Sequence, residues 1–152
     1  MKYFIGNWKM FGVPKSINIL HKINYYYSKD KNRGKYRVII TPPYTLIESY
    51  AKYFKKKKII IGSQNCYQKD QFSSNTATIS PYMIKRVGAN YTLVGHSDNR
   101  SEGDTNEMLK NKVHFALKNN LKVVLCIGEN KKEKKNKKTF SVLKKQLSKV
   151  LE

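Results

Sequence analysis

Polar side chains suited to catalysis follow three of the short apolar runs in this sequence. Asn7 and Lys9 come directly after the first run, His96 and Asp98 come after the fourth, and Glu129 comes after the fifth. A lysine at such a position can bind an anionic group and stabilise developing negative charge. Each of these residues also has a non-catalytic interpretation. Lys9 could be a solvated lysine, His96 a structural histidine, and Glu129 a residue that orients a loop.

The remaining histidines and both cysteines are weaker candidates. His21 and His114 lie inside helical patterns, where a structural role is expected. Cys126 lies within an apolar run and is expected to be a small core residue, and Cys66 has no base near it in the sequence. These scattered residues do not have the spacing of metal ligands, so no metal site is expected.

Short apolar runs and helical patterns alternate along the chain and must position these side chains. The expected strands are residues 3–6, 37–41, 59–62, 91–95 and 122–128. They lack strict alternation, as strands covered on both faces do. The expected helices include residues 14–27, 44–54, 80–88, 104–117 and 140–151. In the first of these, the apolar face is expected to comprise Ile19, Ile23, Tyr26 and Tyr27.

Two of the expected helices carry start signals. Ser80 followed by Pro81 is an N-cap with proline at the first helical position, and Gly88 closes that helix. Asp104 and Glu107 have the spacing of a capping box at the start of the next one.

The alternation of strand and helix five times predicts an α/β domain with a parallel sheet. No linker divides residues 1–152, so one domain is expected. The pattern alone fits an open doubly wound sheet and an incomplete (β/α)₈ barrel equally well. A complete barrel of that kind needs roughly 250 residues. No glycine-rich phosphate loop follows the first strand, which is the usual mark of the doubly wound fold.

The composition is strongly basic, with 31 Lys and Arg against 10 Asp and Glu and a net charge of +21. Such a charge fits either nucleic-acid binding or a general surface bias. Since only four of the basic residues are arginine, the preferred phosphate ligand, the surface bias is favoured and nucleic acid is not the expected partner. The lysine-rich segments 55–58 and 131–138 are expected to be exposed, the second as a loop.

Membrane and secretory classes are not expected. No apolar run approaches the roughly 20 residues of a membrane span. Polar residues interrupt the first apolar run before a signal-peptide core could form. Two cysteines in a chain of this size favour a reducing compartment and argue against a disulfide scaffold, so a soluble cytoplasmic protein is expected.

Six segments together resemble the triosephosphate isomerase family, in its order and at its spacing. They are FIGNWKM at 4–10, PPY at 42–44, IGSQNCY at 61–67, ISP at 79–81, YTLVGHS at 91–97 and CIGE at 126–129. The resemblance covers essentially the whole chain. It implies a TIM-barrel enzyme that interconverts dihydroxyacetone phosphate and glyceraldehyde 3-phosphate in glycolysis and gluconeogenesis, without cofactor or metal.

The resemblance also implies roles for particular residues. Asn7 and Lys9 are expected to bind the substrate, with Lys9 near its negative charge. His96 is expected to polarise the substrate carbonyl as a neutral imidazole, because the start of a helical turn disfavours a cation there. Thr76 is expected at the tip of a loop that enters a neighbouring subunit near its Asn7 and Lys9. Gln64 and Asn65 are expected at the interface of a homodimer.

The sequence departs from the family pattern at three places. Ala77 replaces a loop glycine, which predicts strain if the turn needs a positive φ. Asp98 and Asn99 replace the usual Glu-Arg pair after His96. The chain contains only five of the eight expected βα units, and the family's catalytic glutamate and phosphate-binding glycines belong to the other three.

A polypeptide of these 152 residues is therefore expected to be inactive alone and to need a complementing C-terminal fragment. Two alternatives remain open from the sequence, a non-enzymatic basic protein that binds nucleic acid and a remnant of a gene without a folded product.

Overall fold

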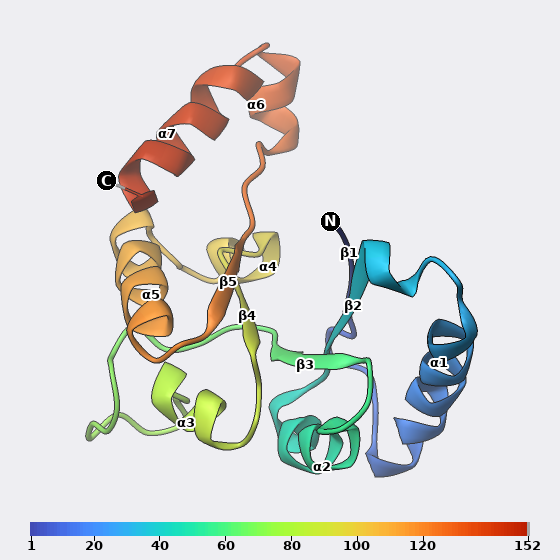
Figure 1. The fold of residues 1–152 in the computed structure, drawn as a ribbon. Coiled ribbons are helices and arrows are strands. Elements are labelled where there is room, and N and C mark those ends of the chain that lie inside the picture. The colour runs from blue at the N-terminus through green and yellow to red at the C-terminus, as the bar shows by residue number, and fades with distance from the viewer. Residues whose placement is uncertain (152) are drawn as a thin grey trace.

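The computed structural model describes residues 1–151, which form one parallel sheet in the order β1-β2-β3-β4-β5 with helices between the strands. The strands are β1 (Lys2–Asn7), β2 (Tyr36–Thr41), β3 (Ile60–Ser63), β4 (Tyr91–Val94) and β5 (Lys122–Leu125). All five expected strands are therefore present. Figure 1 shows them as an arc, with β1 and α1 at one end and β5, α5 and α7 at the other. This is the expected partial TIM barrel of five βα units, and the doubly wound alternative is wrong.

Seven α-helices and two short 3-10 helices occur in the described part of the chain. The α-helices are α1 (Ile17–Lys29), α2 (Tyr44–Phe54), α3 (Pro81–Arg86), α4 (Ser97–Ser101), α5 (Asn106–Lys118), α6 (Lys131–Lys135) and α7 (Thr139–Leu151). The 3-10 helices are Pro14–Ser16, before α1, and Arg33–Lys35, before β2. None of these helices combines the length and the apolar character that a membrane crossing requires.

The core lies between the sheet and the helices that cover it. Its fully buried side chains include Leu20, Leu46, Ile47, Tyr50, Ile84, Leu109 and Ala116. Burial of apolar area on this scale is the main source of stability for such a domain. The expected face of the first helix is partly wrong, because Leu20 and Tyr27 are its buried residues, whereas Ile19 and Tyr26 are exposed. The face of α1 that packs against the core contains Leu20. Consecutive tyrosines lie on several sides of the helix, so they do not identify this face.

One of the two predicted helix starts is confirmed and the other is wrong. Ser80 Oγ accepts a hydrogen bond from the Met83 backbone N–H at 3.2 Å, and Pro81 opens α3 as expected. The capping box assigned to Asp104 is wrong, since Thr105 is the N-cap of α5 and its hydroxyl accepts from the Met108 N–H at 3.2 Å. The Asp104 carboxylate binds a lysine of α5 instead.

The lysine-rich segment after β5 is not a loop throughout, because residues Lys131–Lys135 form the short helix α6. The Asn130 side chain accepts from the Glu133 N–H, and the Glu133 carboxylate accepts from the Asn130 N–H, both at 2.8 Å. This reciprocal cap satisfies two free donors at the start of the helix and is enough to form one turn.

Two loop positions are held in the left-handed region. Ala77 has φ of +59°, which confirms the strain expected where the family has glycine. Gly88 closes α3 with φ of +99°, as a glycine at a helix end allows. A Cβ at Gly88 would lie 2.8 Å from the Cβ of Ala51, so the close approach of α2 also requires glycine.

Candidate functional site

The first half of the candidate site lies where β1 ends. Asn7 is the last residue of β1, and its Oδ1 accepts a hydrogen bond from the Lys9 backbone N–H at 2.9 Å. Lys9 has φ of +50°, an unfavourable conformation for a residue with a side chain. Gln64 stabilises this turn, because its Nε2 donates to the Lys9 carbonyl at 2.8 Å and to the Thr41 carbonyl at 3.0 Å. Three neighbouring strand ends thus fix the direction of Lys9.

The second half of the site lies where β4 ends. His96 follows β4 and caps α4, and its Nδ1 accepts a hydrogen bond from the Asp98 backbone N–H at 3.2 Å. Nδ1 is the acceptor in this contact, which leaves Nε2 as the ring nitrogen available to a ligand.

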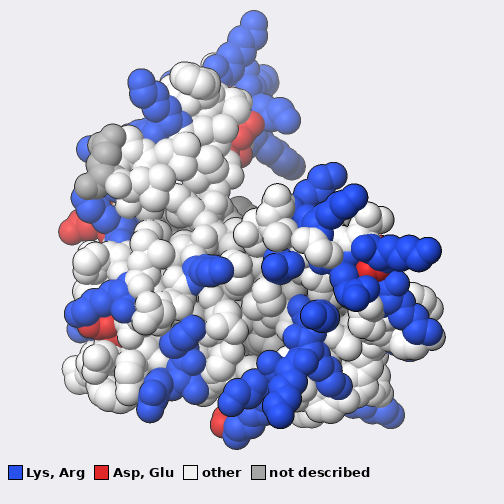
Figure 2. Space-filling view, in the orientation of Figure 1, with Lys and Arg blue, Asp and Glu red and all other residues white. Residues whose placement is uncertain are grey.

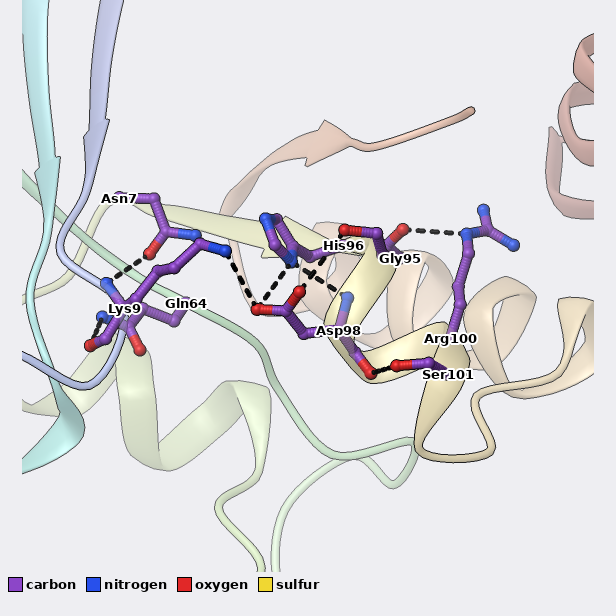
Figure 3. Close-up of polar contacts among 9 residues, drawn as sticks. Asn7, Lys9, Gln64, Gly95, His96, Asp98, Arg100 and Ser101 are labelled. Atoms are coloured by element: carbon purple, nitrogen blue, oxygen red, sulfur yellow. Dashed lines mark hydrogen bonds and ion pairs between the residues drawn. The ribbon is translucent and has the colours of Figure 1, made fainter. Parts of the chain in front are cut away.

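An ion pair joins the two halves. Lys9 Nζ lies 3.2 Å from Asp98 Oδ2, and the same oxygen lies 3.5 Å from His96 Nδ1. Figure 3 shows the Lys9 side chain extending from the β1 side towards Asp98, next to the His96 ring. Asn7, Lys9, Gln64, His96 and Asp98 line one open cavity of about 490 Å³. Asn65 also lines this cavity, so the structure brings together six of the predicted site residues.

The charge of Asp98 depends on its neighbours in this cavity. The hydrogen bond from the Lys9 ammonium lowers the pKa of the Asp98 carboxyl, and the positive charge of Lys9 adds to the effect. Aspartate is one methylene shorter than the family's glutamate, yet it still reaches the lysine. Asp98 therefore forms an ion pair with Lys9 at the centre of the site.

The comparisons with known proteins agree with this geometry. A family model described as triosephosphate isomerase matches residues 2–152. A triosephosphate isomerase of Caldanaerobacter subterraneus is 33% identical over 147 residues, and one of Debaryomyces hansenii is 36% identical over 151 residues. These alignments include 96% and 98% of this chain. The crystal structure of the Bartonella henselae triosephosphate isomerase superposes with a TM-score of 0.91 at 30% identity and covers 98% of this chain.

The chain belongs to the triosephosphate isomerase family. It spans 58% of the length of the Caldanaerobacter relative, 59% of the Debaryomyces relative and 61% of the Bartonella chain. The matched part contains the Asn7, Lys9 and His96 positions, together with the first five strands of the family's barrel.

Arg100 is a site residue that the sequence pattern did not reveal. Its Nε donates to the Gly95 carbonyl at 2.8 Å, its Nη2 to the Cys126 carbonyl at 3.1 Å, and its Nη1 to Asn106 Oδ1 at 3.1 Å. Arg100 therefore links the ends of β4 and β5 directly behind His96. The sequence could have indicated Arg100 by its position four residues after His96, on the same helical turn.

Cys126 does not lie in the core, contrary to the sequence-based expectation. β5 ends at Leu125, the Cys126 N–H makes one more bond to the Val94 carbonyl at 2.8 Å, and the Gly128 N–H and carbonyl bond to the Gln146 side chain at 2.9 and 2.8 Å. Cys126 is half-buried and lines a second cavity of about 600 Å³ that also borders His96 and Glu129. Glu129 orients the following segment, since its Oε1 accepts from the Thr139 hydroxyl at 3.1 Å.

Asn65 lines the Lys9 cavity and is held from behind by Lys112, whereas Cys66 lies behind the site. Asn65 Oδ1 accepts a hydrogen bond from Lys112 Nζ at 3.1 Å, and the same ammonium pairs with both oxygens of Asp104 at 2.6 and 2.7 Å. Burial raises the pKa of the Cys66 thiol to about 12, so Cys66 is an unreactive core residue. Lys112 was not predicted, although it occupies the apolar stripe between Leu109 and Val113.

Thr76 is not brought to the cavity of its own chain. It lies in the exposed segment between β3 and α3, and it does not line the cavity around Lys9. The segment is tied to α5, since Asp70 accepts from Lys118 and Asn119, both at 2.6 Å. These hydrogen bonds lower the pKa of the Asp70 carboxyl.

Proposed function

We propose that these residues form the substrate-binding and electrophilic half of a triosephosphate isomerase site, which interconverts dihydroxyacetone phosphate and glyceraldehyde 3-phosphate. The observation that carries the proposal is the arrangement of Lys9 and His96 around one cavity at the strand ends. The lysine supplies a fixed cation and the histidine supplies a neutral donor. This is the pair that an anionic substrate with a carbonyl group requires.

Each residue has a defined part in the proposed reaction. The Lys9 ammonium attracts the phosphate-bearing substrate, and the substrate displaces the Asp98 carboxylate from it. His96 Nε2–H donates a hydrogen bond to the substrate carbonyl oxygen, which favours removal of the neighbouring carbon-bound proton. Asn7 contacts the substrate and holds the Lys9 turn. The base that removes the proton is the glutamate of the sixth βα unit, as the family resemblance implies.

Barrel units six to eight must also be supplied for this reaction. Units six to eight, supplied by further chain or by a complementing polypeptide, would cover the open edges of β1 and β5 and add the base and the phosphate-binding glycines. The second cavity beside His96 and Cys126 faces the side of β5 where the sixth unit would lie. This cavity has room for the glutamate side chain of that unit.

A homodimer is the proposed assembly. In such a dimer the loop that carries Thr76 would reach the Lys9 cavity of the partner, and Gln64 and Asn65 would lie close to the interface. The large exposure of Met10 and Phe11, 95% and 75%, supports a contact surface next to this cavity. The free cysteines Cys66 and Cys126 support a reducing compartment, which we take to be the cytoplasm.

The proposal is tested by complementation. The 152-residue chain is coexpressed with units six to eight of a relative, and isomerase activity of the purified complex is measured in a coupled assay. Activity is expected in the complex, and His96→Gln should lower kcat by about 10²-fold or more, because the carbonyl loses its donor. Lys9→Met should raise KM.

The matched controls are His114→Gln and Lys15→Met, which replace an exposed histidine and an exposed lysine away from the cavity. Both should keep the activity of the unmodified complex. A purified complex without turnover, or one whose activity His96→Gln leaves intact, would contradict the proposal.

A further inference from the structure

A cavity lies at the opposite end of the sheet from the candidate site, and all the charged residues in its lining are basic. It has a volume of about 320 Å³ and lies between the end of α1, the start of β2 and the segment after α2. Its charged residues are Lys31, Arg33, Arg37 and Lys58. Since the candidate site lies at the carboxyl ends of the strands, this cavity is a separate feature of the molecule.

No ion pair within residues 1–151 neutralises the lining cations of this cavity. The lysines and arginines in the ion pairs found there are lysines 9, 52, 112 and 118, and none of these lines the cavity. The Asp30 carboxylate offsets part of the charge, because it interacts with Arg33, but its Oδ2 accepts from the Tyr36 hydroxyl at 2.6 Å and its Oδ1 from the Asn32 N–H at 2.7 Å. Four gathered cations beside one carboxylate repel one another, and an anion would relieve that repulsion.

A second basic cavity adjoins the first through the lysine-rich segment 55–58. It has a volume of about 500 Å³, and Lys52, Lys55, Lys57 and Arg86 line it. The single acidic residue in its lining, Glu48, already pairs with Lys52 at 2.6 Å. Two cavities that share one segment can hold phosphates at successive positions, which favours a polymer over a single small anion.

The distribution of arginine also favours a phosphate ligand. Only four arginines occur in the chain, and Arg33, Arg37 and Arg86 line these two cavities, whereas Arg100 is used behind His96. The arginine guanidinium binds phosphate oxygens in pairs, which lysine does not. Figure 2 shows basic side chains in several groups on the visible face, and one of these groups lies on the side of α1 and its connection to β2.

A partly exposed aromatic ring lies beside Lys57, one of the residues that line the second cavity. Tyr53 of α2 is 45% exposed, and Lys57 Nζ lies 3.7 Å from the centre of its ring. His21 of α1 stacks on the same ring, with a centroid separation of 4.7 Å. These contacts hold the Lys57 ammonium at the surface beside the cavity, and cations placed in this way follow the backbone of bound single strands.

We propose that this basic surface, formed by the two cavities, binds the phosphodiester backbone of single-stranded nucleic acid. The binding is independent of the His96 site and does not rest on isomerase activity. It is insensitive to base sequence, because cations recognise phosphates rather than base edges.

The test is the salt dependence of binding to a fluorescent single-stranded oligonucleotide, measured by anisotropy with the full 152-residue chain. The triple variant Arg33→Gln/Arg37→Gln/Lys58→Gln should lower the log–log salt slope by about two, because each neutralised phosphate contributes about 0.7 to that slope. A control that removes the same charge elsewhere, Lys132→Gln/Lys134→Gln/Lys135→Gln in α6, should keep the original slope. Circular dichroism verifies the fold of both variants.

A second variant, Lys31→Gln/Lys58→Gln, leaves the half-buried Arg37 in place and should lower the slope by about 1.4. An equal decrease in the α6 control would overturn the proposal, because bulk charge alone would then explain binding. Absence of binding at low salt would also overturn it, as would retention on anionic lipid vesicles without oligonucleotide binding. Displacement of the oligonucleotide by inorganic phosphate at an equal phosphate concentration would overturn the polymer assignment.

Discussion

At the scale of single residues, the Lys9 cavity shows how one carboxylate can hold a binding site ready. Asp98 offers its backbone N–H to His96 and its carboxylate to Lys9. The first contact makes Nδ1 an acceptor, and the second directs the lysine towards the cavity. Under the proposed function, an anionic substrate would replace the carboxylate at the lysine without disturbing the histidine. One residue thus positions both groups on which the proposed chemistry depends.

The Asp98 carboxyl is expected to titrate below its ordinary range, and Lys9→Met should raise its pKa, because the largest cause of the lowering is then removed. The pKa is lowered in the folded protein because the Lys9 hydrogen bond favours the charged form. The ion pair therefore persists above the unfolded-state pKa and is lost as the pH falls through the lowered value. Carboxyl chemical shifts in an NMR pH titration measure this directly. Lys15→Met serves as the control, and an equal shift there would contradict the local cause.

At the scale of elements, the buried ammonium of Lys112 holds the segment after β3 against α5. The side chains of Lys112 and Asp104 are only 4% and 9% exposed, and Asn65 supplies the third oxygen. A buried cation needs all of these partners, since its lost hydration is otherwise uncompensated. This arrangement matters for the site, because Asn65 directly follows the Gln64 that fixes Lys9.

Lys112→Met is expected to lower the free energy of unfolding by about 3–5 kcal/mol, because it leaves the Asp104 carboxylate buried without a cation. The double variant Lys112→Met/Asp104→Leu should recover most of that stability, since no charge is then stranded. Lys110→Met, an exposed position on the same helix, should change stability by less than about 0.5 kcal/mol. Urea unfolding followed by circular dichroism measures all three. A double variant as unstable as the single one would contradict this account.

At the scale of the whole molecule, the sheet has two free edges within the described residues. On β1, Tyr3, Phe4 and Ile5 are 53%, 58% and 38% exposed, although the strand pairs along its full length with β2. An exposed apolar edge strand is a template for pairing with another chain. The same edges are where further barrel units would close the structure.

A polypeptide of these 152 residues alone is expected to show no isomerase turnover and to self-associate as its concentration rises. The proposed base belongs to a sixth βα unit, and the free edge of β1 exposes apolar side chains. Phe4→Lys should reduce association in analytical ultracentrifugation, whereas Tyr26→Lys, at an exposed position on α1, should not. A coupled assay that shows turnover abolished by His96→Gln would contradict the first part of this prediction.

The strands, most helix starts and the family membership could be predicted from the sequence because they depend on neighbouring residues. The cap at Ser80, the closure at Gly88 and the strain at Ala77 are set within a few positions along the chain. The family segments are likewise contiguous stretches such as residues 4–10 and 91–97. Predictions of helix starts failed where two local signals competed, as at Asp104 and Thr105.

Only the tertiary structure decided which charged residues act together. Lys9 and Asp98 are 89 positions apart, Arg100 and Cys126 are 26 apart, and Asn65 and Lys112 are 47 apart. Such contacts form because parallel strands end at one edge of the sheet and helices return to the other. The sequence by itself therefore determined a basic α/β chain with a lysine and a histidine after two strands. The fold determined that these two share a cavity, and that three of the four arginines gather at the opposite end.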